Sequence, residues 1–471
     1  MRTSRCKHPI YYLYLAAALL LLIPLLTACG DEDVAADGAI VVPDSYETIQ
    51  EAIDAAEEGD IIVVRPGTYA GSINFNGKNI TLRSTDPDDP EIVSQTIIDA
   101  RGSGSVVTFA GGESSEAVLS GFTIMGGSGT RTVLEFEVEG QPEEIQSYFG
   151  GGIIVLEGSA PTITNNVIAD NIAERGGGIF VYRAEATIEN NRIVENVSTG
   201  GGGGIFLADS YAEINNNVVD DNRAGRSGGG VAISGTGRAA AVFEGNTISN
   251  NVAQNGGGFS ILDASPVISN NVITGNRSDG RGGGLFAARS DLQLTGNNVS
   301  DNRAGDTGGG VALFVESSGN IEDNVITGNE ASAGGGLAVL ANSLPFIANN
   351  MVSDNTARNG GGLFIIEGSD AVLSGNTIAE NYAELNGAGM LVVSASPTVE
   401  ENTFSGNEAR RDGGALMVSL DSNPRINANV FENNSAREGA AIHVSEGGSI
   451  TLSSPDSNTY QGNSPDDIYQ E

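Results

Sequence analysis

Charged side chains occupy one position of a sequence unit that recurs along the chain, and three of them have the chemistry of a binding site. Glu157, Arg183 and Asp209 each lie seven residues after the first glycine of a unit, in three successive units. If the units stack, the arginine lies between two carboxylates, and this set could bind a sugar or hold a cation. Cross-strand ion pairing is the alternative interpretation, and it contributes only about 0.2–1 kcal/mol for an exposed pair.

Aromatic rings recur three residues earlier in the same units. Phe180, Phe206 and Phe286 each follow the first glycine of a unit by four residues, at a strand position predicted to face outward. Exposed rings can stack on sugar rings or contact a protein partner, whereas a covering loop or self-association would bury them. Residues 131–149 interrupt the repeat just before this column and alternate apolar with acidic side chains, so we expect an extended excursion that could supply such a cover.

Two further residues have acid–base chemistry. His443 occupies an outward strand position in the last unit, where a solvated surface side chain is expected. Lys78 lies in a turn before a strand, and we expect it to serve the structure and not catalysis. The sequence contains neither the acidic calcium cluster with a basic partner typical of polysaccharide lyases nor the paired Asp and histidine motif of the related hydrolases.

The elements that would position these residues follow from the repeat. A glycine cluster returns about every 26 residues, as at Gly150, Gly176 and Gly202. Repetition at a fixed period of this length is the signature of a solenoid. A second asparagine follows five residues after each member of a first asparagine column. That first column consists of Asn166, Asn191, Asn217, Asn246, Asn271, Asn297, Asn324, Asn350, Asn376, Asn402 and Asn429.

The unit predicts short strands and not helices. Runs such as 161–163 and 178–181 alternate inward and outward with period two over three to five residues. Asparagine tolerates left-handed backbone at sharp corners, and stacked asparagines can hydrogen-bond to one another as amide ladders. The two asparagine columns are therefore predicted to lie at corners of a coil of three strands. Stacked about 4.8 Å apart, roughly 14 to 16 such coils would form a rod.

The stretch Tyr46–Ala56, followed by residues 59–69, looks like the amino-terminal cap and first coil of right-handed parallel β-helix proteins of the pectin-lyase-like superfamily. The resemblance spans roughly residues 39–455. It implies an all-β fold, a single right-handed parallel β-helix solenoid with a short N-terminal capping helix. The apolar spacing within residues 48–56 also predicts, by itself, a short amphipathic helix that covers the open end of the coils.

Some later repeats resemble a second family. Phe404–Asn407, the pair Gly413 and Gly414, and Phe431–Asn434 are similar to the paired motifs of polymorphic outer-membrane adhesins. Both families share one architecture, so the fold does not depend on which resemblance is preferred. We therefore expect an N-terminal cap over residues 39–60, a β-helix over residues 61–455 with the 131–149 excursion, and a C-terminal cap or tail over residues 456–471.

The first residues resemble a bacterial lipoprotein signal peptide. Basic residues precede an apolar run from Ile10 to Ala28, and the run ends in the lipobox-like sequence Leu-Thr-Ala-Cys-Gly around Cys29. The resemblance implies removal of residues 1–28, a lipid on Cys29, an acidic tether over residues 29–38, and a location in the cell envelope at the outer membrane or cell surface. A transmembrane helix is the alternative, because 19 apolar residues could just span a bilayer.

Composition restricts the partners. Without residues 1–28 the chain keeps 20 basic residues against 60 acidic ones, a formal charge of −40, which excludes nucleic acid. Cys6 would be removed and Cys29 lipidated, so no disulfide or thiol metal site remains. No cofactor is expected. Ca²⁺ binding by acidic turns stays open, since Ca²⁺ takes carboxylate and carbonyl oxygens, but no calcium loop and no metal ligand set is identified.

Two functions remain compatible with the sequence. In the first, a non-enzymatic, lipid-anchored envelope solenoid binds a polysaccharide or a surface protein along one face. In the second, the chain is a polysaccharide lyase or glycoside hydrolase with its site near Glu157, Arg183 and Asp209. The uniform repeat favours the first function, because a catalytic coil usually breaks the pattern with clustered polar residues. Fold analogy alone does not decide between them.

Overall fold

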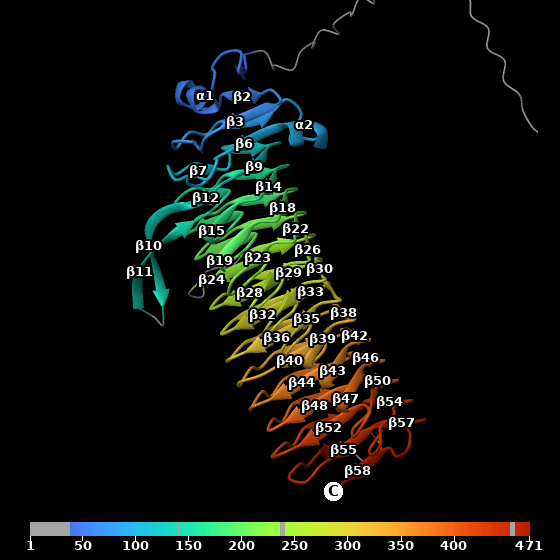
Figure 1. The fold of residues 1–471 in the computed structure, drawn as a ribbon. Coiled ribbons are helices and arrows are strands. Elements are labelled where there is room, and N and C mark those ends of the chain that lie inside the picture. The colour runs from blue at the N-terminus through green and yellow to red at the C-terminus, as the bar shows by residue number, and fades with distance from the viewer. Residues whose placement is uncertain (1–37, 139–140, 236–240, 453–456) are drawn as a thin grey trace, which may run out of the picture.

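The computed structural model describes residues 38–138, 141–235, 241–452 and 457–471 of the 471-residue chain. Cys29 and the predicted signal peptide lie outside the described residues. The described chain forms a right-handed parallel β-helix. It runs as a long rod from helix α1 (Ile49–Ala55) at one end to strand β58 (Ile468–Gln470) at the other (Figure 1). No helix within the described ranges is long and apolar enough to cross a bilayer.

A complete coil contains four short strands and not the three predicted. One coil consists of β16 (Ile179–Tyr182), β17 (Thr187–Glu189), β18 (Arg192–Val194) and β19 (Val197–Gly201). Corresponding strands of successive coils pair in parallel, in sheets of 15, 16, 15 and 12 strands, and the 12-stranded sheet also contains one antiparallel pair at its first edge. The sequence missed the strand that follows the second asparagine. Members of that sheet such as β23 (Arg223–Ala224) are very short and rich in polar residues, so they show little period-two alternation of apolar residues.

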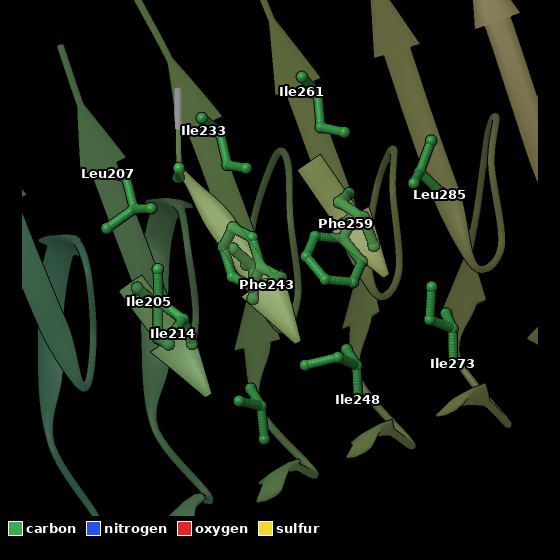
Figure 2. Packing of buried hydrophobic residues seen from close by; sticks show 14 of the residues in the cluster. Ile205, Leu207, Ile214, Ile233, Phe243, Ile248, Phe259, Ile261, Ile273 and Leu285 are labelled. Carbon is green, nitrogen blue, oxygen red and sulfur yellow. The ribbon is translucent and has the colours of Figure 1, made fainter. Parts of the chain in front are cut away.

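Inward-facing side chains form one continuous core along the rod axis. Leu207, Ile233 and Ile261 occupy the same position of three successive coils and lie in a row (Figure 2), each almost fully buried. Opposite them, Ile248 and Ile273 stack in another sheet. Burial of one such side chain contributes about 1.5–3 kcal/mol, and every coil repeats the contribution.

The two predicted asparagine columns form buried amide ladders at two corners of the coil. Asn329 shows the pattern, because its Nδ2 donates to Val299 O at 2.9 Å and to Asn355 Oδ1 at 3.0 Å. Its Oδ1 accepts both the backbone N–H and the Nδ2 of Asn302, each at 3.0 Å. The side chain thus bridges coils on both sides of its own and leaves no polar atom of the amide unpaired.

At each corner one residue adopts the left-handed backbone conformation and the next provides the ladder amide. The left-handed conformation expected of the ladder asparagines falls on the residue before each of them, such as Asn165, Asp170 and Gly245, whose φ values are 57°, 54° and 67°. The ladder asparagine is then free to turn its side chain along the rod axis. Both ladders continue beyond the predicted columns, to Asn458 and Asn463.

Glycine is required where the fourth strand turns into the next one. Gly176 has a φ of 67°, and a Cβ there would lie 2.5 Å from Ile179 O and 2.8 Å from Phe180 Cβ. A Cβ on the following Gly177 would lie 2.5 Å from the carbonyl oxygen of Gly203 on the next coil. A side chain at Gly177 would therefore require the two coils to shift, as they must where Ala388 and Ala440 occupy the equivalent position on later coils.

The ends of the rod are closed differently. At the amino end Thr48 and Glu51 form a capping box on α1, and Lys78 Nζ donates to the carbonyl oxygens of Ile53, Asp54 and Ala56, each at 2.8 Å. Lys78 therefore holds the carboxyl end of this helix, which is a structural role. At the other end β57 (Thr459–Gln461) and β58 extend two of the sheets. The strand ladders therefore run past residue 455, into the segment expected to be a cap or tail.

Replacement of Asn329 by Leu should destabilise the rod far more than replacement of the exposed Arg358 by Ala. The leucine leaves Val299 O and the amide groups of Asn302 and Asn355 without their partners, and each unpaired buried group costs about 1–3 kcal/mol. Denaturant unfolding followed by circular dichroism measures the difference. Equal unfolding midpoints for the two variants would show that the ladder contributes little.

Candidate functional site

A hairpin leaves the rod where the sequence predicted an excursion. Strands β10 (Thr130–Val138) and β11 (Gln141–Phe149) pair antiparallel and stand out along one side of the rod (Figure 1). The hairpin is attached to the solenoid through Phe149, which pairs in parallel with Arg175 of β15 (Ile172–Arg175). Its base therefore lies beside the outward face of the sheet that contains β16.

The hairpin covers the first part of the aromatic column. Phe136 and Phe149 of the hairpin pack on Phe180, Tyr182 and Phe206 in a second apolar cluster that is separate from the axial core. The Phe149 and Phe180 ring centroids lie 4.7 Å apart, and those of Phe180 and Phe206 lie 5.7 Å apart. Phe180 is fully buried and Phe206 is 6% exposed. The expectation that Phe180 presents its ring to a ligand is therefore wrong, because the hairpin occupies that space.

The charged column is in place but does not form the predicted set of three. Arg183 Nη2 lies 3.6 Å from Glu135 Oε1 of the hairpin, and its Nε lies 4.0 Å from Asp209 Oδ2. Glu157 is exposed and forms no ion pair with Arg183. The guanidinium also lies over the ring of Tyr182, whose hydroxyl donates to the carbonyl oxygen of Glu135. Arg183 and Tyr182 thus fasten the hairpin to the rod.

Beyond the hairpin the same outward face opens into a cleft of about 460 Å³. Phe206 and Phe286 from the aromatic column lie at its walls, and Phe286 is half-buried. Arg175 and Arg226 enter from the corner that precedes the glycine clusters. The other lining residues are Glu174, Thr199, Gly200, Gly201, Ser227, Ala232, Ile233, Ser234, Asn255, Ser260 and Leu262. Glu157, Arg183 and Asp209 lie outside this lining.

The two arginines give the cleft a positive charge within a strongly acidic protein. Neither guanidinium forms an ion pair with a carboxylate among the described residues. The Arg175 guanidinium instead lies 4.9 Å from the ring centroid of Phe136 and 5.8 Å from that of Phe206. Burial lowers the pKa of Arg175 from its ordinary value, and the charge of Arg226 lowers it further, while Glu174 and Glu143 act in the opposite direction. The group remains a cation at neutral pH.

This arrangement combines two modes of recognition. Aromatic rings at the walls offer flat apolar faces to a sugar ring. Guanidinium groups offer paired N–H donors that match a carboxylate or sulfate, and they also donate to hydroxyl groups. The backbone and side chains of Ser227, Asn255 and Ser260 add polar groups along the floor. The cleft is therefore suited to a polar, ring-containing ligand that carries negative charge.

Sequence reasoning missed both arginines of the cleft. They occupy the positions just before the glycine clusters, at Arg175-Gly176 and Arg226-Ser227-Gly228, to which the repeat pattern assigned no role.

The expectation that His443 is a solvated surface residue is wrong. It is 1% exposed and not solvated, because Tyr469 from the last strand stacks on its ring with centroids 5.1 Å apart.

The comparisons with known proteins concern the fold. The chain matches the family described as right handed beta helix region over residues 73–248, 224–351 and 283–463. No curated protein sequence matches it. Among solved structures, the catalytic unit of a thermostable GH87 alpha-1,3-glucanase from Streptomyces thermodiastaticus strain HF3-3 is 15% identical, with a TM-score of 0.32. That alignment covers 92% of this chain and 69% of the glucanase chain.

Two other structures are similar at the same level. The Siphovirus 9NA tailspike receptor binding domain is 10% identical, with 90% of this chain and 76% of that chain covered and a TM-score of 0.30. The family 28 exopolygalacturonase of Yersinia enterocolitica is 10% identical, with 90% and 75% covered and a TM-score of 0.27. Likeness of this degree carries no argument about this chain, and its fold is shown by the family match alone.

Replacement of Phe180 by Ala should destabilise the protein by about 3–5 kcal/mol, as for a core phenylalanine, although its side chain faces away from the solenoid axis. Phe364 provides the matched control, because it occupies the same column on a later coil and is half-buried. Phe364→Ala should therefore lower the unfolding midpoint much less. If the two variants unfold at the same denaturant concentration, the hairpin does not bury Phe180 in solution.

Proposed function

Because the chain belongs to the right-handed β-helix family, we propose that it is a non-enzymatic, lipid-anchored protein of the cell envelope that binds a polysaccharide in the cleft beside the hairpin. The observation that carries this proposal is the combination of Arg175 and Arg226 with the rings of Phe206 and Phe286 around one cleft. The bound polysaccharide carries carboxylate or sulfate groups, which pair with the two guanidinium groups.

Electrostatics favour an anionic sugar over a neutral one. Most of the protein surface repels anions, since acidic residues outnumber basic ones 60 to 23. A guanidinium in a partly buried cleft loses part of its hydration. Without an acidic partner, this loss is offset only when an anion binds. Arg175 is in this position, and its guanidinium lies beside the rings of Phe136 and Phe206. Arg226 is exposed but adds a second positive charge to the same cleft, so the cleft favours a ligand of opposite charge.

The cleft lacks the groups that hydrolysis requires. Glycoside hydrolases place two carboxyl groups about 5–9.5 Å apart on either side of the bond that breaks. Among the described residues that line the cleft, Glu174 is the one acidic residue. A single exposed carboxylate has no partner with which to divide the roles of acid and base. Binding without turnover is thus the function that the lining supports.

The lipid anchor would fix the rod at its amino-terminal end. The proposal rests on Cys29, which directly follows the apolar run and is followed by a short acidic segment. The β-helix begins at β1 (Ile40–Val42), only eleven residues after Cys29. Eleven residues span at most about 40 Å, so the tether would keep α1 and the first coils within that distance of the membrane, with the cleft several coils further along the rod. Adjacent coils are about 4.8 Å apart, so the cleft stands tens of ångströms from the lipid.

Arg226→Ala and Phe286→Ala should each weaken binding to acidic polysaccharides at least tenfold in a glycan-array screen followed by calorimetry. The expected loss arises because one variant removes a guanidinium and the other a ring from the cleft. Arg358→Ala and Phe364→Ala are the matched controls, since both lie outside the cleft lining, and they should bind as the wild type does. Binding should weaken as salt is raised, because it depends on charge.

The same screen separates binding from catalysis. Each polysaccharide that binds is incubated with the protein, with and without Ca²⁺, and its reducing ends and unsaturated products are measured. Intact polysaccharide agrees with the proposal. Shortened chains would show that the protein is an enzyme, and unchanged affinity of both cleft variants would place the binding site elsewhere on the rod.

Cys29→Ser should abolish lipid attachment and release the protein from the membrane fraction. A serine lacks the thiol to which the lipid is joined, so mass spectrometry should find the signal peptide uncleaved or the amino terminus unmodified. The control is Cys6→Ser, because Cys6 lies within the segment expected to be removed. Loss of membrane association in the Cys6 variant, or its retention in an unlipidated Cys29 variant, contradicts the anchor.

A further inference from the structure

Three potential metal ligands meet near the carboxyl-terminal end of the rod, far from the cleft. Asp412 and Glu438 lie on neighbouring coils just before the glycine clusters and form a parallel bridge between their backbones. His443 lies on β55 (Ile442–Val444) and faces outward. One imidazole nitrogen of His443 and one carboxylate oxygen from each acid all lie within 4.8 Å of one another.

The histidine is buried and incompletely bonded. Its side chain is 1% exposed, and Nδ1 has no hydrogen-bond partner among the described residues. Nε2 lies 3.7 Å from Glu471 Oε1, which is beyond hydrogen-bond distance. The ring of Tyr469 stacks on the imidazole at an interplanar angle of 20° and fixes its plane. A buried polar nitrogen without a protein partner is uncommon in folded proteins and is available to a water molecule or a metal ion.

We propose that Asp412, Glu438 and His443 bind a zinc ion. Imidazole nitrogen together with carboxylate oxygen is a ligand set that Zn²⁺ accepts, whereas Ca²⁺ and Mg²⁺ take oxygen ligands. Zinc bonds of about 2.0–2.2 Å place tetrahedral ligand atoms about 3.3–3.5 Å apart. The two carboxylates, which are only partly buried, need to move inward by about 1 Å to reach that geometry.

Arg437 now neutralises the two acids and would compete with the ion. Its Nη2 lies 3.1 Å from Asp412 Oδ1 and 3.7 Å from Glu438 Oε2. The arginine side chain is 58% exposed, so it can turn into solvent when the ion binds. Glu471 Oε1 faces His443 Nε2 from 3.7 Å and would accept a hydrogen bond from it after a small movement, an arrangement common around zinc-bound histidines.

The bound ion would fasten the last coils of the rod. A solenoid frays from its ends, because the terminal coil has a neighbour on one side only. Asp412, Glu438 and His443 come from two successive coils, and Glu471 and Tyr469 belong to the last strand segment. Zinc would therefore stabilise the carboxyl-terminal end without any contact with the cleft.

The test is calorimetric titration of the full chain with ZnCl₂, together with its thermal unfolding. One ion should bind per chain and raise the unfolding temperature. Asp412→Asn and Glu438→Gln keep the shape of each side chain and should each weaken zinc binding at least tenfold, whereas Arg437→Ala should tighten it. Zinc should also shift the imidazole ¹⁵N resonances of His443 in the nuclear magnetic resonance spectrum.

The acid variants and a matched control test the site without replacing the buried His443. Asp306 lies just before the glycine cluster of an earlier coil, as Asp412 and Glu438 do on theirs, so Asp306→Asn should leave zinc affinity unchanged. Zinc binding that survives in both conservative acid variants, or that disappears in Asp306→Asn, overturns the proposal. Unchanged His443 resonances in the presence of bound zinc overturn it as well.

Discussion

The stacked amides of asparagine constrain the rest of the molecule. Each ladder asparagine bonds to the coil before its own and to the coil after it, as Asn329 does with Val299, Asn302 and Asn355. The two ladder asparagines of a coil are always five residues apart, so no residue can be inserted between them without breaking both ladders. Variation in coil length is confined to the arcs without a ladder. The arc from Gly228 to Asn246, for example, is three residues longer than that from Gly202 to Asn217.

The position of the hairpin follows from the same constraint. In the coil from which it leaves, Phe122 and Gly127 stand where later coils have ladder asparagines, and their backbone N–H groups donate to Asn166 Oδ1 and Asn171 Oδ1 at 3.0 and 2.9 Å. The ladders therefore begin on the next coil. The nineteen-residue excursion can leave the solenoid here because it interrupts no hydrogen bond between ladder asparagines. The hairpin then lies over the outward face that the following coils provide.

Periodic features could be predicted from the sequence, and features that depend on distant contacts could not. The coil length, the asparagine columns and the capping helix repeat or stand next to one another in sequence, so pattern alone identifies them. The fourth strand was missed because stacking, and not apolar alternation, holds strands as short as Arg223–Ala224 extended. For Phe180 the sequence left open whether residues 131–149 cover its ring, because the contact with Phe149 depends on docking that no local pattern specifies. His443 was assigned to the surface for the same reason, since Tyr469 covers it from the next coil.

One outward column thus acquires three different environments along the rod. It begins as an apolar cluster under the hairpin at Phe180, lines an open cleft at Phe206 and Phe286, and ends in a buried imidazole at His443. An inward residue contacts side chains from its own and both adjoining coils, so its size is fixed on every side. An outward residue is fixed only by its two neighbours in the column and by whatever covers it. The interior therefore stays apolar from coil to coil, although the size of the side chain varies along one inward column, as from Ile261 to Ala287 and Leu313. Differences in polarity and charge are found mainly on the outside, where a change in one coil leaves the register of all the others intact.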